Sequence, residues 1–303
     1  MSDSILVTSD NSGIRIDKYL SGIYADFSRS YIAKLIEDGH ITVNGNAIKV
    51  SYKLNEGDII NIDDIEAEEL EIIPQAIKLD ILYEDSDVIV VNKPKGMVVH
   101  PDNVHKDGTM VNALLYHCKD LSGINGVLRP GIVHRIDMDT TGSIIACKND
   151  FSHEKIAQQL SVHSMNRTYI AIVHGVIKDD EGRIDLPIGR DEKNRKRMAV
   201  NHRNGKAAVT NYKVLKRFNN FTYVECRLET GRTHQIRVHM TQMGHPLLGD
   251  EVYSNRKNPY PNIACGQCLH AYKLGFIHPR TSEYIETVAP IPEYFERLLK
   301  IIE

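Results

Sequence analysis

The stretch GIVHRIDMDTTG, residues 131–142, decides the fold that we expect for the larger part of this chain. An apolar lead-in precedes the tetrapeptide His-Arg-Ile-Asp, which ends at Asp137, and the short polar residues up to Gly142 are typical of a turn. The run SIIACK, residues 143–148, is β-branched and apolar, as in a short strand. We therefore expect Asp137 at a strand end, on a loop that is held by two strands.

The residue types in this loop leave several interpretations open. Arg135 and Asp137 could form an ion pair that only closes a hairpin, and composition alone favours this reading. A carboxylate and a guanidinium on a loop are also common at functional sites. A third reading is a metal-dependent hydrolase that uses Asp137 and Asp139 as ligands, and activity that survives EDTA would exclude it.

The composition excludes several classes of protein. A chain of 303 residues can form one large domain or two, and 42% hydrophobic with 25% charged residues supports a sizeable core. No run of about 18 apolar residues occurs, so we expect no contact with a membrane. The N-terminus lacks the basic and apolar parts of a signal peptide, and the cysteine count of five is odd. We expect reduced thiols and a cytoplasmic protein.

The net charge of −3 does not mark a nucleic-acid binder, but its distribution is informative. Residues 1–75 hold 6 Lys and Arg against 14 Asp and Glu, and the remainder holds 31 against 26, which gives net charges of −8 and +5. Six of the acids fall in DDIEAEELE, residues 63–71. Such a run is usually solvated, so we predict an acidic linker at residues 63–75 between two domains.

The segment before this linker predicts a small αβ module at residues 13–62, behind a tail of residues 1–12. One helix begins near Arg15 in RIDKYL, and a second is SRSYIAKLIEDG, with Ser28 as the N-cap and Gly39 at its end. The spacing i, i+3, i+4 predicts that its buried face consists of Ile32, Leu35 and Ile36. An Asn-Gly turn at residues 44–45 predicts a hairpin, and LNEGDIINI adds a strand.

This module resembles the S4 RNA-binding domain. The marks of the resemblance are Arg15, Ser28-Arg29-Ser30, Gly39, Val43-Asn44-Gly45 and Gly57-Asp58. In S4 domains the helix with the Ser-Arg-Ser segment touches the RNA backbone, which implies RNA-binding roles for Arg15, Arg29, Ser30 and Lys34. A cationic helix start suits phosphates. The alternative is a module that merely packs on its neighbour.

The segment HRIDMDTTG resembles the catalytic-loop motif H-R-L-D-x-x-T-S-G of pseudouridine synthases of the ribosomal large-subunit type. The resemblance implies that Asp137 is the nucleophile, and that His134 and Arg135 contact the substrate. Arg135 would enter the base stack in place of a flipped uridine. Met138 departs from the family, in which this position is often basic.

Two further segments agree with the family in order along the chain. NKPKGMVVHP, residues 92–101, resembles the motif K-P-x-G-x-x-V-H-P, whose turn supports the catalytic loop, so we do not expect Lys93 to be catalytic. RTYIAIVHG, residues 167–175, alternates like a strand and resembles the motif whose tyrosine lines the uracil pocket. This implies that Tyr169 stacks on the base, with a proposed part in proton removal. By composition alone, a tyrosine on a strand is usually a core residue.

The segment GRTHQIRVH, residues 231–239, resembles the third family motif at every defined position. The resemblance implies a salt bridge from Arg237 to Asp137, within about 4 Å. A desolvated carboxylate needs such a partner, so we expect Asp137→Asn to restore the stability that Arg237→Met loses. The same motif implies substrate-binding roles for Arg232 at the pocket rim, His234 and Gln235. The spacing of His234 and His239 fits no metal pair.

Two other segments carry polar or reactive residues. CGQCLHAYKLGFIHP, residues 265–279, resembles the last family segment and implies a substrate contact for Leu269. Its CxxC spacing at Cys265 and Cys268 could suggest zinc, but no second pair exists, and Cys268 stands where relatives have a small residue.

The basic loop RDEKNRKR, residues 190–197, predicts phosphate contacts. Its candidate RNA-binding residues are Arg190, Arg195, Lys196 and Arg197.

The sequence therefore predicts an α+β chain in two domains. A small S4-like αβ domain would precede a pseudouridine-synthase domain at residues 76–303, with a mixed, mainly antiparallel sheet flanked by helices and loops. The resemblance implies isomerisation of specific uridines in structured RNA and is strongest to the subfamily that acts on the helix 69 loop of 23S ribosomal RNA. We expect a monomer that binds RNA, free or in a partly assembled large subunit, and no DNA. Because atoms are only rearranged, we expect neither cofactor nor metal.

A non-catalytic S4-type RNA-binding or ribosome-assembly protein with an inert site remains the alternative. The presence of Asp137, Tyr169 and Arg237 together argues against it.

Overall fold

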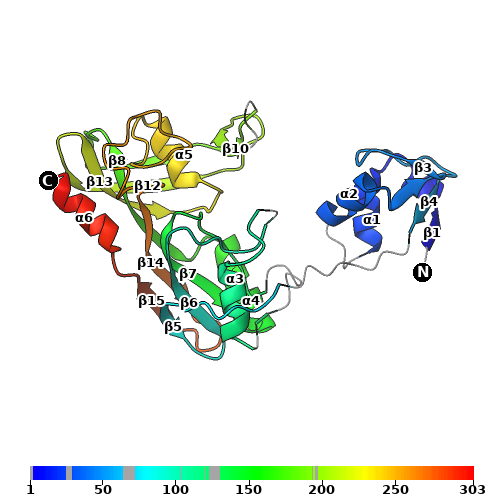
Figure 1. Ribbon diagram of the computed structural model, residues 1–303, viewed down its shortest axis with the longest axis horizontal. Helices are drawn as coiled ribbons and strands as arrows, with labels where there is room; N and C mark the ends of the chain where they lie inside the picture. Colours follow the sequence, from blue (N-terminus) through cyan, green and yellow to red (C-terminus); the bar gives the residue numbers. More distant parts are fainter. Residues whose placement is uncertain are drawn as a thin grey trace. The chain divides into compact units, whose positions relative to one another are not determined.

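The computed structural model describes the chain except for residues 1–2, 25–28, 64–71, 103, 120, 123–129, 193 and 195–196. Its contacts divide the chain into two compact units, Met1–Leu70 and Glu71–Glu303 (Figure 1). Each unit has a hydrophobic core of its own, so each is described by itself. No described helix is long and apolar enough to cross a membrane.

The first unit is a four-stranded antiparallel sheet with two α-helices. The strand order is β1-β4-β2-β3. The elements are β1 (Asp3–Leu6), the 3₁₀ turn η1 (Ser9–Asn11), α1 (Ile16–Ile23), α2 (Arg29–Glu37), β2 (Ile41–Val43), β3 (Asn46–Ala47) and β4 (Ile59–Ile62). The core contains the predicted apolar face of the second helix, Ile32, Leu35 and Ile36.

The predicted hairpin is confirmed, and the Asn-Gly pair explains its geometry. Asn44 and Gly45 have φ angles of 52° and 75°, which a tight turn between two strands requires. The Asn44 side chain accepts a hydrogen bond from the Ile59 N–H and donates one to Asp58, so the turn is tied to β4. Gly39 ends α2 with a φ of 84°, as predicted, whereas the proposed N-cap, Ser28, lies outside the described residues.

The predicted tail of residues 1–12 is wrong. Residues 3–6 pair with β4 as the edge strand of the sheet, in the register Asp3↔Ile62 to Leu6↔Ile59. Val7 is 1% exposed and donates its N–H to the Asp58 carbonyl oxygen. A four-residue edge strand has too little pattern to be read from sequence, because its partner lies more than fifty residues away.

A nine-stranded sheet forms the centre of the second unit. The order is β5-β6-β7-β14-β8-β13-β12-β9, with β15 paired to β14. β14 and β7 are parallel and the other pairs in the sheet are antiparallel, so the predicted mixed, mainly antiparallel sheet is confirmed.

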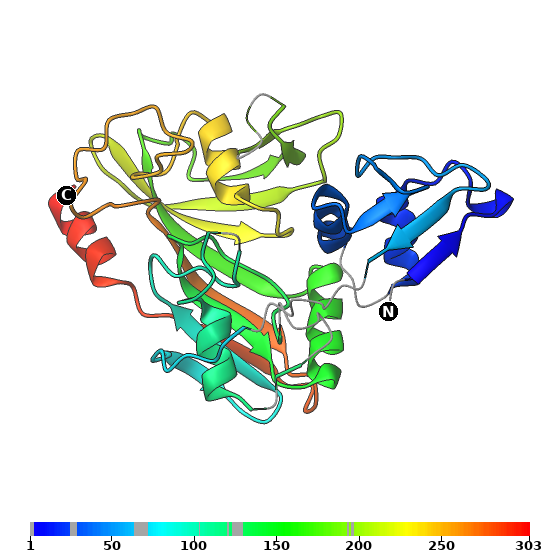
Figure 2. The ribbon, with the colours of Figure 1, turned by 45° about the vertical axis from the view of Figure 1, so that its right-hand side comes forward.

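The strands of this unit are β5 (Ile81–Glu84), β6 (Val88–Lys93), β7 (Thr141–Cys147), β8 (Asn166–His174), β9 (Glu181–Asp185), β12 (Val209–Arg217), β13 (Phe221–Leu228), β14 (Leu269–Ile277) and β15 (Tyr284–Val288). A separate hairpin consists of β10 (Ile188–Arg190) and β11 (Met198–Val200). The helices are α3 (Met110–His117), α4 (Asp150–Ser161), α5 (Gln235–Gln242) and α6 (Glu293–Ile301). Figure 2 shows how the long central strands run through the unit.

Helices cover both faces of the large sheet. Residues of α3 and α5 share one core with Ile89 and Val91 of β6, whereas α4 shares another with Val88 and Val90. Residues of α6 pack on the second face with Ile170 and others of β8. Strands covered on both faces read as continuous apolar runs. This explains why β8 is buried from its second residue onward rather than alternating as the sequence suggested.

Gly142 allows the parallel contact at the centre of the sheet. β7 and β14 pair through Thr141 with His270 and Gly142 with Ala271. A Cβ atom at Gly142 would lie 2.3 Å from the Ala271 carbonyl oxygen, and the φ angle of Gly142 is 107°. Only glycine fits both conditions. The last residue of the 131–142 stretch therefore brings the loop before β7 against the start of β14.

The predicted linker is too long at its C-terminal end. Ile72 is 8% exposed and belongs to the core shared by α3 and α5. Asn112 of α3 donates a side-chain hydrogen bond to the Ile73 carbonyl oxygen and accepts the Gln75 N–H at its own carbonyl oxygen. Residues 72–75 are thus part of the second unit, which begins before residue 76.

A comparison of two fragments tests this boundary. We expect fragment 71–303 to fold cooperatively and to melt roughly 4–10 °C above fragment 76–303, because burial of Ile72 contributes about 2 kcal/mol and the contacts of Asn112 add to it. Circular dichroism melts of both fragments measure the difference. Equal melting temperatures would show that residues 71–75 contribute no stability.

Candidate active site

The loop that carries Asp137 is shaped by hydrogen bonds rather than by two strands. β7 follows it as expected, but the described residues 130–136 before it form no strand and make an isolated bridge between Ile132 and Ala146. The expected first strand is therefore wrong. The Thr140 N–H donates to the Asp137 carbonyl oxygen at 3.0 Å, and the Gly96 N–H donates to that of Met138 at 3.0 Å. These contacts turn the chain sharply at Asp137.

Lys93 anchors this loop from the end of β6. Its side chain is fully buried, and its Nζ donates to the carbonyl oxygens of Pro94, Met97 and Met138, each at 2.8 Å. Three acceptors use all three protons of an ammonium group. Burial lowers the pKa of Lys93 to about 7, and the carboxylate of Asp139 opposes this shift. The contacts make Lys93 a positioning residue.

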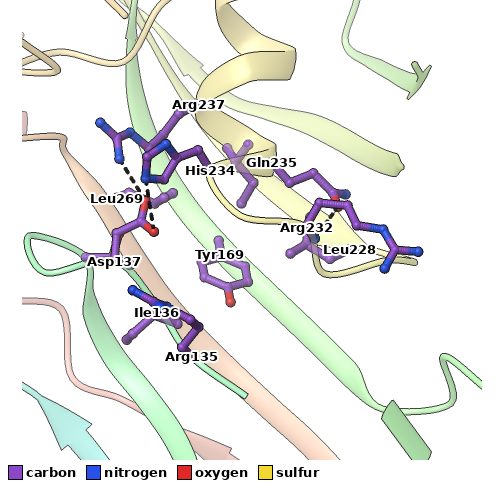
Figure 3. A pocket seen from close by; sticks show the side chains of 12 residues that line it. Arg135, Ile136, Asp137, Tyr169, Leu228, Arg232, His234, Gln235, Arg237 and Leu269 are labelled. Atoms are coloured by element: carbon purple, nitrogen blue, oxygen red, sulfur yellow. Dashed lines mark hydrogen bonds and ion pairs between the residues drawn. The ribbon is translucent and has the colours of Figure 1, made fainter. Parts of the chain in front are cut away.

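The pair predicted between Asp137 and Arg237 is present. Figure 3 shows the Arg237 guanidinium directed at the Asp137 carboxylate, and the Nη1–Oδ2 distance is 2.9 Å. The Arg237 side chain is 6% exposed and that of Asp137 is 18% exposed. The carboxylate is thus accessible at the pocket, while its partner is held inside the protein on the first turn of α5.

The sequence analysis missed Asp250, which binds the same guanidinium. Its Oδ2 accepts from Nε of Arg237 at 2.7 Å and its Oδ1 from Nη2 at 3.0 Å, and its side chain is 0% exposed. Oδ1 also accepts the N–H groups of Val252 and Tyr253. Burial opposes the charge of Arg237, but the hydrogen bond to Asp250 and the charge of Asp137 outweigh it and raise its pKa.

His234 approaches the other oxygen of Asp137. It precedes α5 with a φ angle of 57°, a left-handed conformation that is uncommon for a residue with a side chain. Its Nε2 lies 3.8 Å from Oδ1 of Asp137, and its Nδ1 lies 2.8 Å from the Tyr253 hydroxyl. That hydroxyl accepts the Met198 N–H, so it can donate its own proton to Nδ1. Burial lowers the pKa of His234, which favours a neutral ring with its Nε2–H toward Asp137.

Tyr253 also links this site to the β10–β11 hairpin. The guanidinium carbons of Arg197 and Arg237 each lie 5.0 Å from the centre of its ring. Such cation–π contacts hold the two cations against one aromatic side chain. Tyr253 was not identified from the sequence, where it follows Asp250 by three residues in an ordinary turn.

Three cavities meet at Asp137, with volumes of about 50, 490 and 380 Å³. Arg135, Asp137 and His234 line all three. The smallest is also lined by Ile136, Thr140, Tyr169, Leu228, Arg232, Gln235, Ile236, Arg237 and Leu269. Most of the site residues predicted from four separate segments are therefore gathered at one place.

Tyr169 and Leu269 form the apolar part of the pocket. Tyr169 lies on β8 and pairs with Ala271 of β14. Leu269 begins β14, two residues before Ala271. Figure 3 shows the ring of Tyr169 below Asp137 and Arg237. Burial raises the pKa of Tyr169, and the charge of Asp137 raises it further while Arg167 opposes this. The phenol therefore keeps its proton at neutral pH.

Gln235 and His134 were predicted to bind substrate, but the protein itself occupies their polar atoms. The Gln235 amide oxygen accepts from Thr230 and from the Arg232 N–H, and its nitrogen donates to Val209 and Thr210. Nε2 of His134 accepts the Ile145 N–H at 3.1 Å. Burial, with the charge of Arg167, lowers the pKa of His134 to about 3, so it is neutral. Both residues position the loops that carry their neighbours.

Arg135 and Arg232 extend along the rim of the pocket. Arg135 is exposed, with its Nη1 3.2 Å from Nε2 of His100. Nε of Arg232 donates to the Ala207 carbonyl oxygen at 3.0 Å, which leaves its terminal nitrogens directed outward (Figure 3). The positions of both side chains are compatible with contacts to a polyanion.

The predicted RNA-binding residues lie in both units. Lys34 is exposed on α2, whereas Arg15 is held in a fork by Asp17 at 2.9 and 3.0 Å. Arg190 ends β10, and Arg197 stacks on Tyr253. The side chains of Arg29 and Ser30, and the residues Arg195 and Lys196, lie outside the described part of the chain.

The positive charge beside Asp137 argues against a metal-dependent hydrolase that uses Asp137 and Asp139 as ligands. Oδ2 of Asp137 faces a guanidinium at 2.9 Å, which would repel a divalent cation. The described residues form two groups of three potential ligands, Glu84-His117-Cys118 and Asp85-Asp87-His278, and neither includes Asp137 or Asp139. Cys265 donates to the Pro261 carbonyl oxygen, and Cys268 is buried. His239 contacts Thr210 and Leu186 away from the site.

Comparison with known proteins identifies the chain. A family model described as RNA pseudouridylate synthase matches residues 87–242, and an S4 domain model matches residues 14–60. The chain is 52% identical over 296 residues to an uncharacterized RNA pseudouridine synthase, YlyB, of Bacillus subtilis (strain 168), across 98% of this chain and 96% of that protein. It is 41% identical over 309 residues to ribosomal large subunit pseudouridine synthase D of Zymomonas mobilis, across 99% and 97%.

A solved structure, human RNA pseudouridylate synthase domain containing 4, has the same fold, with a TM-score of 0.57 and 24% identity over 73% of this chain and 92% of that one. The chain therefore belongs to the RNA pseudouridylate synthase family and carries an S4 domain. It is an RNA pseudouridine synthase, an isomerase, and both resemblances seen in the sequence are confirmed.

Asp250 changes the stability expected of variants at Arg237. We expect Arg237→Met to cost about 3–5 kcal/mol, because it strands the fully buried Asp250 carboxylate as well as Asp137. Adding Asp137→Asn should then recover little, contrary to the expectation from sequence. Adding Asp250→Asn should recover most of the loss, since an Asn oxygen can still accept the N–H groups of Val252 and Tyr253.

Urea denaturation of the single and double variants measures these differences. Asp139→Asn combined with Arg237→Met is the matched control, since among the described residues the guanidinium is bonded to Asp250 and Asp137 and not to Asp139. If Asp137→Asn rescued Arg237→Met better than Asp250→Asn did, Asp250 would not be the principal partner of Arg237.

Proposed function

We propose that this synthase isomerises uridines of ribosomal RNA with Asp137 as the nucleophile. The observation that carries the proposal is the Asp137 carboxylate, held at 2.9 Å by Arg237 and facing cavities lined by Tyr169 and Leu269. A partly exposed carboxylate with a buried cationic partner is fixed in direction and open to the pocket. These are the properties that a carboxylate nucleophile needs.

The isomerisation of uridine requires only groups of this chain and of the RNA. Attack of Asp137 on C1′ forms a C–O bond and breaks the bond to N1, whose electron pair leaves with the uracil. Elimination to a glycal, with Asp137 as the base, is the other route to a detached uracil. The base then turns and C5 bonds to C1′. On the first route this breaks the C–O bond to C1′ and frees the Asp137 carboxylate, and on the second route Asp137 returns to C2′ the proton that it removed. C5 then loses its proton and N1 gains one. No electron or group is exchanged with a cofactor.

The pocket residues divide the remaining tasks. Tyr169 offers a ring face for stacking, and its raised pKa makes it a poor base at neutral pH, so we assign it to holding the uracil. Leu269 closes the apolar side of the smallest cavity. The exposed Arg135 is suited to fill the gap that a flipped uridine leaves in its stack.

The names of several relatives support a large-subunit RNA target. Proteins named ribosomal large subunit pseudouridine synthase D, from Zymomonas mobilis and Pseudomonas aeruginosa, are each 41% identical to this chain. We propose 23S ribosomal RNA as the substrate, with a helix 69-type loop as the target and the enzyme acting as a monomer in the cytoplasm. Mapping pseudouridines in ribosomal RNA from a deletion strain tests this target.

We predict that Asp137→Asn reduces pseudouridine formation by at least roughly 10⁴-fold, because loss of the nucleophile lowers kcat of a serine protease by about 10⁶-fold. The RNA affinity should change less than about threefold, because phosphate contacts made elsewhere supply most of the binding free energy. Tritium release from 5-³H-uridine RNA measures the rate, and filter binding measures the affinity.

Asp139→Asn serves as the matched control and should retain most of the activity. Wild-type turnover of the Asp137→Asn variant would remove Asp137 from the mechanism. Loss of wild-type activity in EDTA would favour the metal-dependent alternative. A wild-type protein that binds ribosomal RNA without forming pseudouridine would support the non-catalytic, ribosome-assembly alternative.

The S4 domain should contribute to RNA binding and leave the chemistry intact. We predict that fragment 71–303 binds the mapped RNA at least about tenfold more weakly, with kcat at saturating RNA within a factor of about three. In the full chain, Lys34→Met should reduce the slope of log affinity against log salt by about 0.7–0.9, the effect of one phosphate contact. Fluorescence anisotropy over a salt series measures both effects, and an unchanged affinity of the fragment would contradict an RNA-binding role.

A further inference from the structure

Arg167 is a buried cation beside the pocket, and the mechanism proposed above gives it no role. It is the second residue of β8 and only 7% exposed. Among the described residues its Nε is buried without a hydrogen-bond partner, and its one hydrogen bond, from Nη2 to the Glu229 carbonyl oxygen, is long at 3.5 Å. No described carboxylate lies within 4 Å of its guanidinium. A buried charge without a partner is costly, which calls for a ligand or a further role.

The residues around Arg167 leave space for its guanidinium group. A Cβ atom at Gly231 would lie 2.5 Å from Nη1 of Arg167, so the glycine leaves room for the guanidinium. Burial lowers the pKa of Arg167, and the charge of Arg232 lowers it further while Tyr169 opposes this. Arg167 lines the cavity of about 490 Å³ together with Arg135 and Arg232, and Asp137 is the sole carboxylate in that lining.

The position of Arg167 relative to Tyr169 is suited to the binding of one nucleotide by both residues. The two residues are separated by one position on β8, so their side chains lie on the same face, about 7 Å apart along the strand. Both line the same cavity. A uracil held against Tyr169 would place the phosphodiesters of its own nucleotide within reach of a cation further along this face.

We propose that Arg167 binds a phosphodiester group of the RNA next to the uridine that is held against Tyr169. The proposal rests on the function proposed above and adds a specific anion site to it. A guanidinium with free donors can bind two phosphate oxygens at once, which fixes the backbone as well as attracting it. Because the guanidinium is already desolvated, the favourable free energy of binding a phosphate is larger than for an exposed arginine on the rim.

The test uses a stem-loop RNA that carries a uridine first mapped as a target in ribosomal RNA. A methylphosphonate replaces the phosphodiester on the 5′ side of that uridine in one RNA and on the 3′ side in another, which removes one charge at a time. With the wild-type enzyme, one of the two changes should weaken binding by about 10–100-fold, the value of a hydrogen bond to a charged group. The affected side identifies the phosphate.

Arg167→Met should weaken binding of the unmodified RNA by a similar factor and should no longer respond to that methylphosphonate. Its salt slope should fall by about 0.7, as for one phosphate of a single strand. Arg167→Lys should retain part of the binding, since a lysine keeps the charge without the fork. Arg297→Met, an exposed arginine on α6, is the matched control and should leave affinity and methylphosphonate response unchanged.

Gly231→Ala provides a second variant in case Arg167→Met does not fold, because the added methyl displaces the guanidinium and keeps the charge in the chain. It should weaken binding in the same direction, with the same loss of response to the methylphosphonate. The inference is overturned if the wild type and both variants respond equally to the two methylphosphonates. If the wild type forms no pseudouridine in any RNA, the proposed function fails instead, and the two failures are thus distinguished.

Discussion

The geometry of the candidate active site depends on one guanidinium that is shared by two carboxylates. Arg237 forms two hydrogen bonds with the fully buried Asp250 and one with the more accessible Asp137. The buried partner fixes the cation, so an N–H of Nη1 points at the Asp137 carboxylate in one direction only. Asp137 therefore does not need to be buried itself to be well oriented. The same division leaves its second oxygen free for the pocket, where His234 is at 3.8 Å.

The sheet topology explains why residues 100 positions apart meet in this pair. The parallel contact of β7 with β14 places the loop before β7 next to Leu269, and β14 in turn pairs with β8, which carries Tyr169. Gly142 permits this contact because no side chain fits beside the Ala271 carbonyl oxygen. Lys93 then fixes the loop through the carbonyl oxygen of Met138. The pocket is thus a consequence of strand order at the centre of the sheet.

Local patterns predicted much of this arrangement, and their failures have physical reasons. The face of Ile32, Leu35 and Ile36 and the Asn-Gly hairpin follow from short-range periodicity and turn chemistry. The edge strand β1 and the packing of Ile72 depend on partners that are distant in the sequence, so the tail and the linker end were misjudged. Gln235 matches a family motif, but a motif does not tell whether a side chain faces substrate or its own backbone.

The sequence by itself determined the S4 domain, the synthase motifs, the candidate nucleophile and the cation expected beside it, because each is carried by a short run of residues whose spacing is preserved in the chain. Only the tertiary structure decided that Asp250 is the main partner of Arg237 and that Tyr253 joins His234 to Arg197. It also showed that Arg167 is buried with no counter-ion in the part of the chain that the structure describes. Charge pairing and desolvation depend on distances between segments that the sheet brings together, and no spacing along the chain contains those distances.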